Sequence, residues 1–297
     1  MRSKQQRLAG IPADKIRKSV ASLRIPRIKS PKTYSNLLRP ILMIRKDIYM
    51  TRNDTIDLLQ SHRSIRRYTD QPIPSEILQE VVTAAQWAPS SHNLQAYSII
   101  VVDDEKKKKA LSVVAGSQKY VEACPVFLVF CADFYRLRLT TEMWDTHFEI
   151  NQVENVLVAA VDTALAAENA FIAARSFGLS GVMIGGIRNN PDKVKELLGL
   201  PEYTIPIMGL CLGYPAQEPW QKPRTPQNIV VHHNQYSSKE EIVHGLEKYE
   251  EISSDYYRRR TNGERNDGWT KQMAQYLSNP RRAHMKEFIK KQGFNFE

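Results

Sequence analysis

Two uninterrupted apolar runs constrain the fold of this chain more than any other feature of its sequence. Residues 126–132 are VFLVFCA and residues 205–212 are IPIMGLCL, so neither run alternates between apolar and polar side chains. Because successive side chains of a strand point to opposite faces of a sheet, a strand without alternation is expected to be buried on both faces. Residues 98–102 and 182–184 are shorter segments of the same kind. The sequence therefore predicts a buried sheet of few strands.

Helical patterns surround these predicted strands. The longest is the alanine-rich segment Val153–Ser176, which Gly178 follows, and glycine is common just beyond the end of a helix. Ser75 is predicted to be the N-cap of a second helix, and the four lysines at 106–109 are expected on the solvated face of a third. Further helices are predicted at 56–61, 240–258 and 280–291. Long helices combined with few buried strands indicate an α+β or an α/β protein.

The net charge of +10 lies entirely in the first 49 residues. This segment contains thirteen lysines and arginines but two acidic residues, whereas residues 50–297 hold 29 basic and 30 acidic side chains. Prolines at positions 12, 26, 31 and 40 would interrupt most helices placed there. We therefore divide the chain into a basic, disordered leader, residues 1–49, and one domain, residues 50–297. Translated upstream sequence, with Met50 as the true start, is a second interpretation of the leader, and a targeting or docking role is a third.

The cysteines and the apolar segments indicate a protein of a reducing compartment, which we take to be the cytoplasm. Cys124, Cys131 and Cys211 lie in or beside apolar runs and none belongs to a CxxC pair, so they are expected to be core residues. The longest apolar stretch carries Asp162, Glu168 and Asn169. It is therefore predicted to be a buried helix rather than a membrane span.

Several common functional motifs are absent from the sequence. It contains no GxGxxG after a strand, no GxxxxGK[ST] and no GxSxG, which argues against a Rossmann dinucleotide site, a P-loop and a hydrolase nucleophile. Its seven histidines include no HExxH or other ligand spacing, so no metal site is predicted. If the chain is an enzyme, its chemistry belongs to a cofactor that scattered polar groups hold.

Two short basic clusters are the candidates for such groups. The first is residues 62–67, HRSIRR, where arginines, a serine and a histidine are suited to an anionic group such as a phosphate. The second is residues 222–224, KPR, in which a proline restricts the backbone between two cations. Each cluster alone is equally compatible with an ordinary basic surface turn. Together they could enclose one phosphate from two sides.

A series of motifs that begins with the first cluster resembles the FMN-dependent nitroreductase family. Within that family, the chain is similar to the oxygen-insensitive major nitroreductase and flavin reductase P branch. The resemblance covers residues 51–294 and not the leader. Its segments are HRSIR at 62–66, YTD at 68–70, AAQ at 84–86, PSSHNLQ at 89–95, AGSQKYV at 115–121, FCAD at 130–133, IGGIRNN at 184–190, GLCLG at 209–213 and KPR at 222–224. His92 and Asn93 stand where relatives often carry a small hydroxyl residue and an aromatic residue, so contacts to substrate could differ.

The resemblance implies a set of flavin-binding residues. His62, Ser64, Lys222 and Arg224 would hold the FMN phosphate with Arg63 close by, and Arg66 would reach the pyrimidine edge of the ring. The remaining implied contacts to the ribityl chain and ring come from Ser90, Ser91, Gln118, Ile184, Gly185 and Gly186.

A second set of residues would bind the nucleotide substrate. Arg260 and Arg265 match arginines that meet the 2′-phosphate of NADPH in this branch of the family. Basic residues at the end of a solvated helix are the alternative interpretation, because cations are favourable there in any helix. No side chain is expected to be an obligate acid or base, so we predict no catalytic residue besides the flavin.

The implied fold is the α+β nitroreductase fold, a mixed sheet flanked by helices in an interlocked homodimer with FMN at the interface. The implied function is an NAD(P)H-dependent, FMN-containing oxidoreductase that reduces nitroaromatics, quinones or free flavin by a ping-pong two-electron mechanism and prefers NADPH. Two alternatives remain at this point. One is a flavin-destroying or dehalogenating relative on the same fold, and the other is a nucleic-acid-binding protein with a basic tail. The leading interpretation includes neither a nucleic acid nor a membrane as partner.

Overall fold

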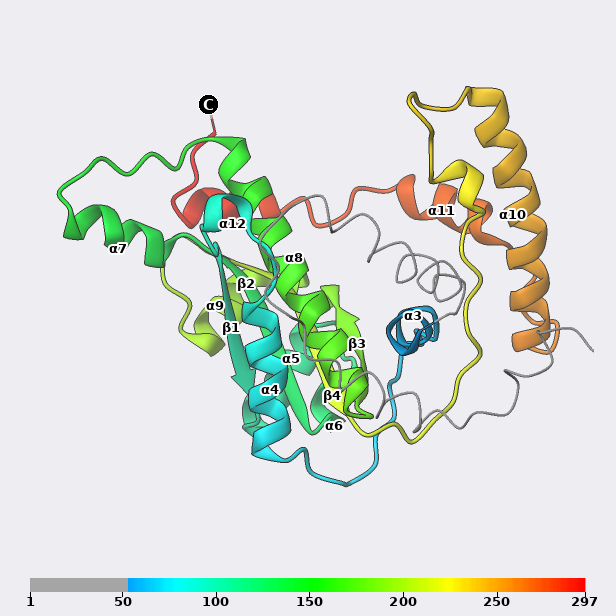
Figure 1. Cartoon of the computed structure of the whole chain (residues 1–297), viewed down its shortest axis with the longest axis horizontal. Helices are drawn as coiled ribbons and strands as arrows, with labels where there is room; N and C mark the ends of the chain where they lie inside the picture. The colour runs from blue at the N-terminus through cyan, green and yellow to red at the C-terminus, as the bar shows by residue number, and fades with distance from the viewer. Residues whose placement is uncertain (1–52, 297) are drawn as a thin grey trace, which may run out of the picture. The chain divides into compact units, whose positions relative to one another are not determined.

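A computed structural model of the chain describes residues 53–296 (Figure 1). The chain divides into two units, Met1–Asn53 and Asp54–Glu297, and the second unit contains all the elements discussed below. The predicted leader, residues 1–49, lies outside the described residues.

Four strands form the sheet at the centre of the second unit. They are β1 (Tyr97–Val102), β2 (Val126–Asp133), β3 (Ser180–Ile184) and β4 (Thr204–Gly213), in the spatial order β1-β2-β4-β3. These four strands match the four that the apolar runs predict, to within two residues at every end. All eight residues of β2 are buried, as its lack of alternation predicts.

The direction of the strands corrects one expectation. We expected a mixed sheet, but β1 with β2, β2 with β4, and β3 with β4 are all antiparallel pairs within the described part of the chain. Unbroken apolar strands are common in parallel sheets because helices cover both faces there. Here helices also cover both faces of the sheet, so its central strands are buried on both faces although the described strand pairs are all antiparallel.

The two layers of helices contact opposite faces of β2. On one face, α4 (Ser75–Gln86) and α8 (Val153–Ser176) pack against Val126, Leu128 and Phe130. On the other face, α5 (Glu105–Val114), α6 (Lys119–Ala123) and α9 (Pro191–Leu198) pack against Phe127 and Val129. All three cysteines are buried in this second cluster, which confirms their prediction as core residues.

The remaining elements are mostly connections and the C-terminal part of the chain. They are α3 (Asp54–Gln60), η3 (Ser91–Asn93), α7 (Tyr135–Met143), η4 (Gly185–Asn189), η5 (Gln227–Ile229), α10 (Lys239–Arg260), α11 (Trp269–Leu277) and α12 (Met285–Lys291). Figure 1 shows α10 and α11 together, away from the sheet, whereas α12 returns to the region where α8 begins. The sequence patterns did not predict α6, α7, α9 or α11.

Two local predictions are wrong in detail. Pro74 rather than Ser75 is the N-cap of α4, and Ser75 is its first helical residue. Lys108, one of the four lysines expected in solvent, is 7% exposed because its Nζ donates a hydrogen bond of 2.8 Å to the carbonyl oxygen of Cys124. A lysine amine is buried only where an acceptor meets it, and here the main chain before β2 supplies that acceptor.

The long helix α8 packs on the sheet through a face that is rich in alanine. It is long and apolar enough to cross a membrane by length and composition, with 39% of its most apolar window buried inside the protein. Its alanines, among them Ala166, Ala167 and Ala170, pack against the sheet and α4. Because alanine allows backbones to approach closely, this face lies directly on the strands, as expected of a core helix.

Asp162 is a charged residue inside this apolar helix, and it is 1% exposed. Its Oδ1 accepts a hydrogen bond of 3.0 Å from the backbone N–H of Ser91, and its Oδ2 accepts one of 3.1 Å from that of Ala96. Between these anchors, His92, Asn93 and Gln95 all have positive φ angles, a conformation that costs energy in residues other than glycine. One carboxylate therefore holds a strained loop on α8.

We expect Asp162→Ala to lower the free energy of unfolding by about 3 kcal/mol, because it removes two charge-assisted hydrogen bonds and leaves two buried N–H groups unpaired. Urea unfolding followed by circular dichroism measures the difference. Glu80→Ala, which removes an exposed carboxylate from the interior of α4, is the matched control and should change stability by less than about 0.5 kcal/mol. Equal effects of the two substitutions would show that Asp162 does not anchor the loop.

Candidate functional site

Backbone pairing brings the two basic clusters of the sequence together. The backbone N–H of Ile65 donates to the carbonyl oxygen of Gly181 in β3 at 2.8 Å, which places the first cluster along the edge of the sheet. Immediately beyond it, Thr69 N–H donates to Tyr214 at 2.9 Å and Ala216 N–H donates to Arg67 at 3.0 Å. The chain that leaves β4 therefore runs antiparallel to residues 67–69 and continues toward the second cluster.

Helix α10 fixes the second cluster in place. The Tyr249 hydroxyl donates a hydrogen bond of 2.9 Å to the carbonyl oxygen of Pro223, between the two cations of the cluster. About two turns further along the same face of the helix, the Tyr256 hydroxyl lies 3.4 Å from the carbonyl oxygen of Trp220, and the two rings meet edge to face. The Gln221 side chain also donates to the carbonyl oxygen of Gln60 at the end of α3.

The two clusters and α10 enclose a cavity of about 60 Å³, which we call the basic cavity. Five cationic side chains line it and no carboxylate does. Since like charges gathered without a counter-charge repel one another, this arrangement favours an anion that the side chains share. The lining residues are His62, Arg63, Ser64, Arg66, Pro219, Trp220, Lys222, Arg224, Tyr256 and Arg260.

Arg63 supplies an observation that points to a missing partner. Its Nε atom is buried and has no hydrogen-bond partner, and its nearest carboxylate, Glu218, lies 3.8 Å from Nη2. Buried polar atoms are nearly always paired in folded proteins. An oxyanion in the basic cavity fits the donors around it, so the residues present are compatible with a phosphate group.

His62 contributes a neutral imidazole to the basic cavity. Its ring meets the Phe171 ring of α8 edge to face, with 5.6 Å between the ring centroids. Burial lowers the pKa of His62 below its usual value of 6.5, and the positive charges of Arg175 and Arg224 lower it further. At neutral pH the imidazole is therefore uncharged and offers a hydrogen bond without adding to the repulsion among the cations.

The segment that carries Gln118 lies next to the first cluster. The Arg66 guanidinium lies over the ring of Tyr120 at 5.7 Å, two residues after Gln118, which is the N-cap of α6. On the other side of this segment, a Cβ on Gly186 would meet the backbone oxygen of Ala115 at 2.4 Å. Gly186 thus has a packing reason to be glycine, namely the contact of η4 with the end of α5. Gly185 precedes it, and Ile184 is buried.

Ser90 and Ser91 do not line the basic cavity. Their loop is bound to Asp162 of α8, whereas His62 packs on Phe171 nine residues further along the same helix. At 1.5 Å per residue the two sites are separated by about 13 Å along the helix axis. Within one chain, the predicted flavin contacts therefore fall into two groups.

The two predicted nucleotide-binding arginines also separate. Arg260 lines the basic cavity, and its Nη1 donates a hydrogen bond of 3.2 Å to the Tyr256 hydroxyl. Arg265 does not line this cavity. Its guanidinium lies over the ring of Tyr257 at 4.5 Å, in the connection between α10 and α11.

Sequence reasoning missed several residues of the site. Trp220 and Tyr256 form aromatic walls of the basic cavity, and Arg175 binds the main chain just before the first cluster through Leu58 and the Ser61 hydroxyl. Tyr256 stands four residues before Arg260, so helical spacing could have placed the two side chains on one face. Arg175 and Trp220 carry no such local signal.

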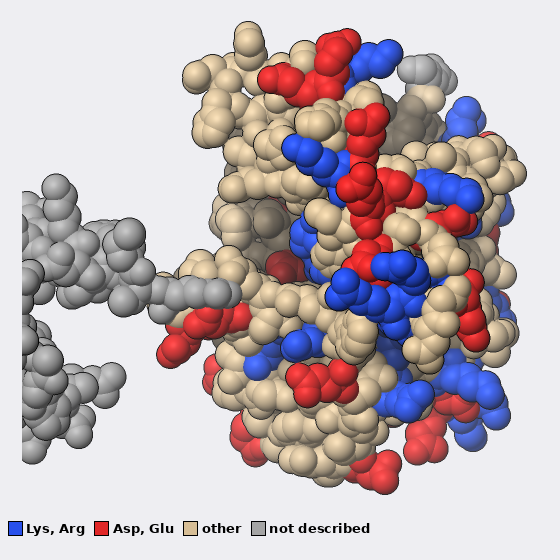
Figure 2. Space-filling model, turned by 90° about the vertical axis from the view of Figure 1, so that its right-hand side faces the viewer, with Lys and Arg blue, Asp and Glu red and all other residues tan. Residues whose placement is uncertain are grey.

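The charge of the surrounding surface is mixed. Figure 2 shows basic side chains gathered near the middle of one face of the molecule, beside a band of acidic ones. In α10 the two signs are ordered along the helix, with Glu240 and Glu241 in its first turn and three arginines in its last. This order complements the helix dipole. Among residues 53–296, no three His, Cys, Asp or Glu side chains are grouped so that they could hold a metal ion.

Comparison with known proteins identifies the family. Residues 59–214 match the model of the nitroreductase family, and residues 222–297 match that of the nitroreductase family C-terminal domain. The chain is 42% identical over 247 residues to an FMN reductase, NAD(P)H, of Bacillus subtilis, covering 82% of this chain and 99% of the relative. It is also 42% identical to an oxygen-insensitive NADPH nitroreductase of Salmonella typhimurium, covering 81% and 98%. The chain therefore belongs to the nitroreductase family.

A solved structure supports the same conclusion at the level of the fold. The NADPH:FMN oxidoreductase from Vibrio harveyi, complexed with NAD⁺, superposes with a TM-score of 0.74 at 38% identity, covering 82% of this chain and 99% of that one. The predicted α+β nitroreductase fold, the oxidoreductase class and FMN as the cofactor are confirmed.

His62 makes the stability of the flavin-free protein depend on pH. Because its folded pKa is lowered, the unfolded chain binds more protons, so stability should fall as the pH drops through 6.5 toward the folded value. We expect His62→Gln to lose less stability than the unsubstituted protein between pH 7.5 and pH 5.5. Urea unfolding at the two pH values measures this difference. Identical pH dependence of the two proteins would contradict a lowered pKa at His62.

Proposed function

We propose that this protein is an NADPH-preferring, FMN-containing oxidoreductase that reduces nitroaromatics, quinones or free flavin by a ping-pong two-electron mechanism. The observation that carries the proposal is the basic cavity, which cations from two distant segments line, together with the unpaired Nε of Arg63, one of the lining residues. The FMN phosphate is a dianion of the size and charge that such donors hold. Steady-state oxidation of NADPH with each class of acceptor, by protein of measured flavin content, tests the proposal.

Each group of residues then has a defined task. His62, Ser64, Lys222 and Arg224 hold the FMN phosphate, and Arg63 pairs its Nε with the same group. Arg66, next to the Gln118 segment, presents a cation to the pyrimidine edge of the ring, where positive charge stabilises the reduced form. Bound FMN supplies the two-electron carrier. The chain itself contributes binding and orientation, so no side chain is assigned as an acid or base.

The phosphate assignment predicts that Lys222→Ala combined with Arg224→Ala yields largely FMN-free protein. Each charge-assisted contact contributes about 1.5–3 kcal/mol, so losing both should weaken FMN binding at least about a hundredfold. Fluorescence titration with FMN measures the dissociation constant.

The matched control also removes one arginine and one lysine, but from positions outside the basic cavity. Arg67→Ala combined with Lys248→Ala changes exposed cations that do not line it, and should leave FMN affinity within about threefold. Unchanged affinity after loss of Lys222 and Arg224 would refute the assignment of the phosphate to this cavity.

NADPH is the proposed electron donor, and Arg260 and Arg265 are its proposed specificity residues. Both lie within or just beyond the end of α10, one in the basic cavity and the other on the connection to α11. The 2′-phosphate distinguishes NADPH from NADH, and a guanidinium contact to it acts on NADPH alone.

We therefore expect Arg260→Ala and Arg265→Ala each to reduce kcat/KM for NADPH by roughly 5- to 150-fold, equivalent to about 1–3 kcal/mol. The value for NADH should scarcely change. Steady-state kinetics with both nucleotides measures the effect. An equal loss with the two nucleotides would assign these arginines to the fold or to the flavin site instead, and no loss with either would assign them to the solvated surface.

The proposal includes a homodimer, and a second copy would cover the outer face of α8. Val153, Leu157, Val161 and Leu165 follow one another at intervals of four residues and are 57%, 56%, 56% and 38% exposed. A row of large apolar side chains in solvent is unusual on a monomer and typical of an interface. The buried alanines of this helix, Ala166, Ala167, Ala170 and Ala174, pack instead against the chain's own sheet and α4.

The resemblance to the family implies that FMN lies at the interface of this dimer. Ser90 and Ser91 do not line the basic cavity and lie about 13 Å along α8 from His62. In the proposed dimer they contact the ribityl chain and ring of the flavin, whereas the basic cavity holds its phosphate. We further propose a cytoplasmic enzyme without nucleic-acid or membrane partners, in which residues 1–49 lie outside the FMN-binding domain, residues 50–297.

A further inference from the structure

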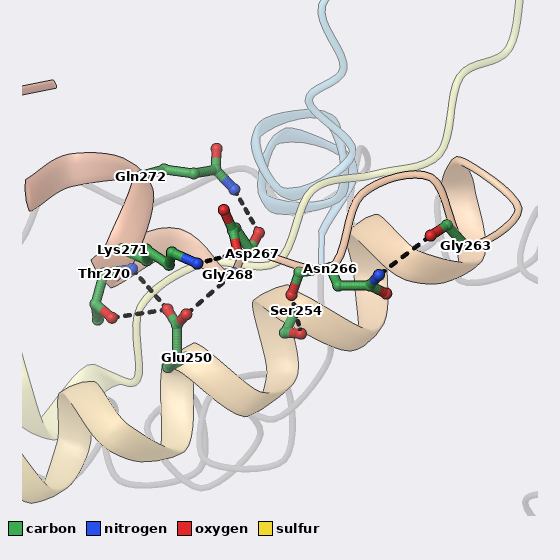
Figure 3. Close-up of polar contacts among 9 residues, drawn as sticks. All are labelled: Glu250, Ser254, Gly263, Asn266, Asp267, Gly268, Thr270, Lys271 and Gln272. Carbon is green, nitrogen blue, oxygen red and sulfur yellow. Dashed lines mark hydrogen bonds and ion pairs between the residues drawn. The ribbon is translucent and has the colours of Figure 1, made fainter. Parts of the chain in front are cut away.

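The connection between α10 and α11 is held to α10 at several points, as Figure 3 shows. Asn262 and Gly263 have positive φ angles of 51° and 88°, so the chain turns sharply where α10 ends. The Ser254 hydroxyl then donates to the carbonyl oxygen of Asn266 at 2.5 Å, and the Asn266 side chain donates to that of Gly263 at 3.1 Å. This connection, residues 261–268, carries Arg265.

Glu250 makes the strongest of these attachments. Its Oε1 accepts a hydrogen bond of 3.0 Å from Gly268 N–H, and its Oε2 accepts from Thr270 twice, at 2.7 Å from the N–H and 2.8 Å from the hydroxyl (Figure 3). Gly268 is the N-cap of α11 and has no side chain with which to cap the helix, so a carboxylate from α10 does this instead. Burial alone would raise the pKa of Glu250, but the hydrogen bonds from Thr270 and Gly268 outweigh it and lower the pKa.

The contact is close enough to determine the residue opposite Glu250. A Cβ on Gly268 would stand 2.5 Å from the backbone oxygen of Glu250 and 2.6 Å from its carboxylate. The start of α11 can therefore reach the carboxylate only because residue 268 is glycine. Trp269 N–H also donates to the Ser253 hydroxyl at 2.7 Å, which adds a second attachment to the same part of α10.

Helix α11 in turn holds the Arg265 guanidinium. Gln272, on its first turn, accepts a hydrogen bond from Arg265 Nη2 at 2.5 Å and donates one of 2.7 Å to the carbonyl oxygen of Asp267. The other side of the guanidinium faces the Tyr257 ring of α10 at 4.5 Å. Arg265 is thus held between the two helices, and its other guanidinium N–H groups are available to an acceptor outside the protein.

We propose that Glu250 and Gln272 are positioning residues for NADPH: Glu250 fixes α11 against α10, and Gln272 on α11 holds Arg265 in place for the 2′-phosphate. This inference rests on the proposed role of Arg265 in binding NADPH. An arginine held in advance loses less side-chain entropy on binding, so the network raises the affinity for the nucleotide that carries the extra phosphate.

The test uses FMN-loaded protein and compares Glu250→Ala, Gln272→Ala, Arg265→Ala and the double variant Glu250→Ala/Arg265→Ala. The measurements are kcat and KM with NADPH and with NADH, together with inhibition by adenosine 2′,5′-bisphosphate. Glu251→Ala and Gln275→Ala are the matched controls, because they remove exposed side chains next to Glu250 and one turn beyond Gln272. Gln272→Ala leaves the cap of α11 intact and so tests the network even if Glu250→Ala does not fold.

We expect Glu250→Ala and Gln272→Ala each to raise KM for NADPH about tenfold and to weaken the binding of the bisphosphate by the same factor. The value of kcat with either nucleotide, and KM for NADH, should stay within about twofold of those of the unsubstituted protein. Glu250→Gln, which keeps one acceptor, should have an intermediate effect. In the Arg265→Ala background, Glu250→Ala should add nothing, since it acts through that arginine. The two controls should resemble the unsubstituted protein.

The contrary outcomes are distinct. An equal effect of Glu250→Ala on both nucleotides, or an additive effect in the Arg265→Ala background, would overturn the inference and leave Glu250 a residue of stability alone. If Arg265→Ala shifts the preference between nucleotides but Gln272→Ala and Glu250→Ala do not, the inference fails and the proposed role of Arg265 stands. If Arg265→Ala does not shift the preference, the proposed role and the inference fail together.

Discussion

The pairing of the chain before α4 with the chain after β4 is the constraint on which the rest of the site depends. Ile65 is hydrogen-bonded to β3, and residues 67–69 lie antiparallel to residues 214–216, which directly extend β4. Two basic segments more than 150 positions apart are thereby brought to one place. Like charges would not gather in this way unaided, so the energy of sheet formation and core packing holds the cations together until an anion neutralises them.

Helix α10 has two roles in this arrangement. Through Tyr249 and Tyr256 it supports the chain on either side of Lys222, and through Glu250 it supports α11. The first role shapes the cavity assigned to the flavin phosphate, and the second holds the arginine assigned to the nucleotide. One helix therefore connects the binding of the cofactor with the choice of electron donor.

Features of the fold and the site that depend on neighbouring residues could be predicted from the sequence, whereas those that depend on contacts between distant segments could not. The four strands and both ends of α8 could be predicted from the pattern of apolar residues, because burial within the core selects apolar side chains at neighbouring positions of the chain. The two basic clusters were recognisable as parts of one site only through their resemblance to a family, because backbone pairing between distant segments joins them. The separation of Arg260 from Arg265, the packing of Gly186 on Ala115 and the antiparallel direction of every strand pair depend on tertiary contacts. No local pattern in the sequence indicates them.

The central claim is that the basic cavity binds the phosphate of FMN, and comparison of FMN with riboflavin tests it most directly. Riboflavin has the same ring and side chain but lacks the phosphate, so the ratio of the two dissociation constants isolates the contribution of that group. The account predicts that FMN binds at least about a hundredfold more tightly than riboflavin at low salt, and that the ratio falls as ionic strength rises. Equal affinities for the two flavins would contradict it.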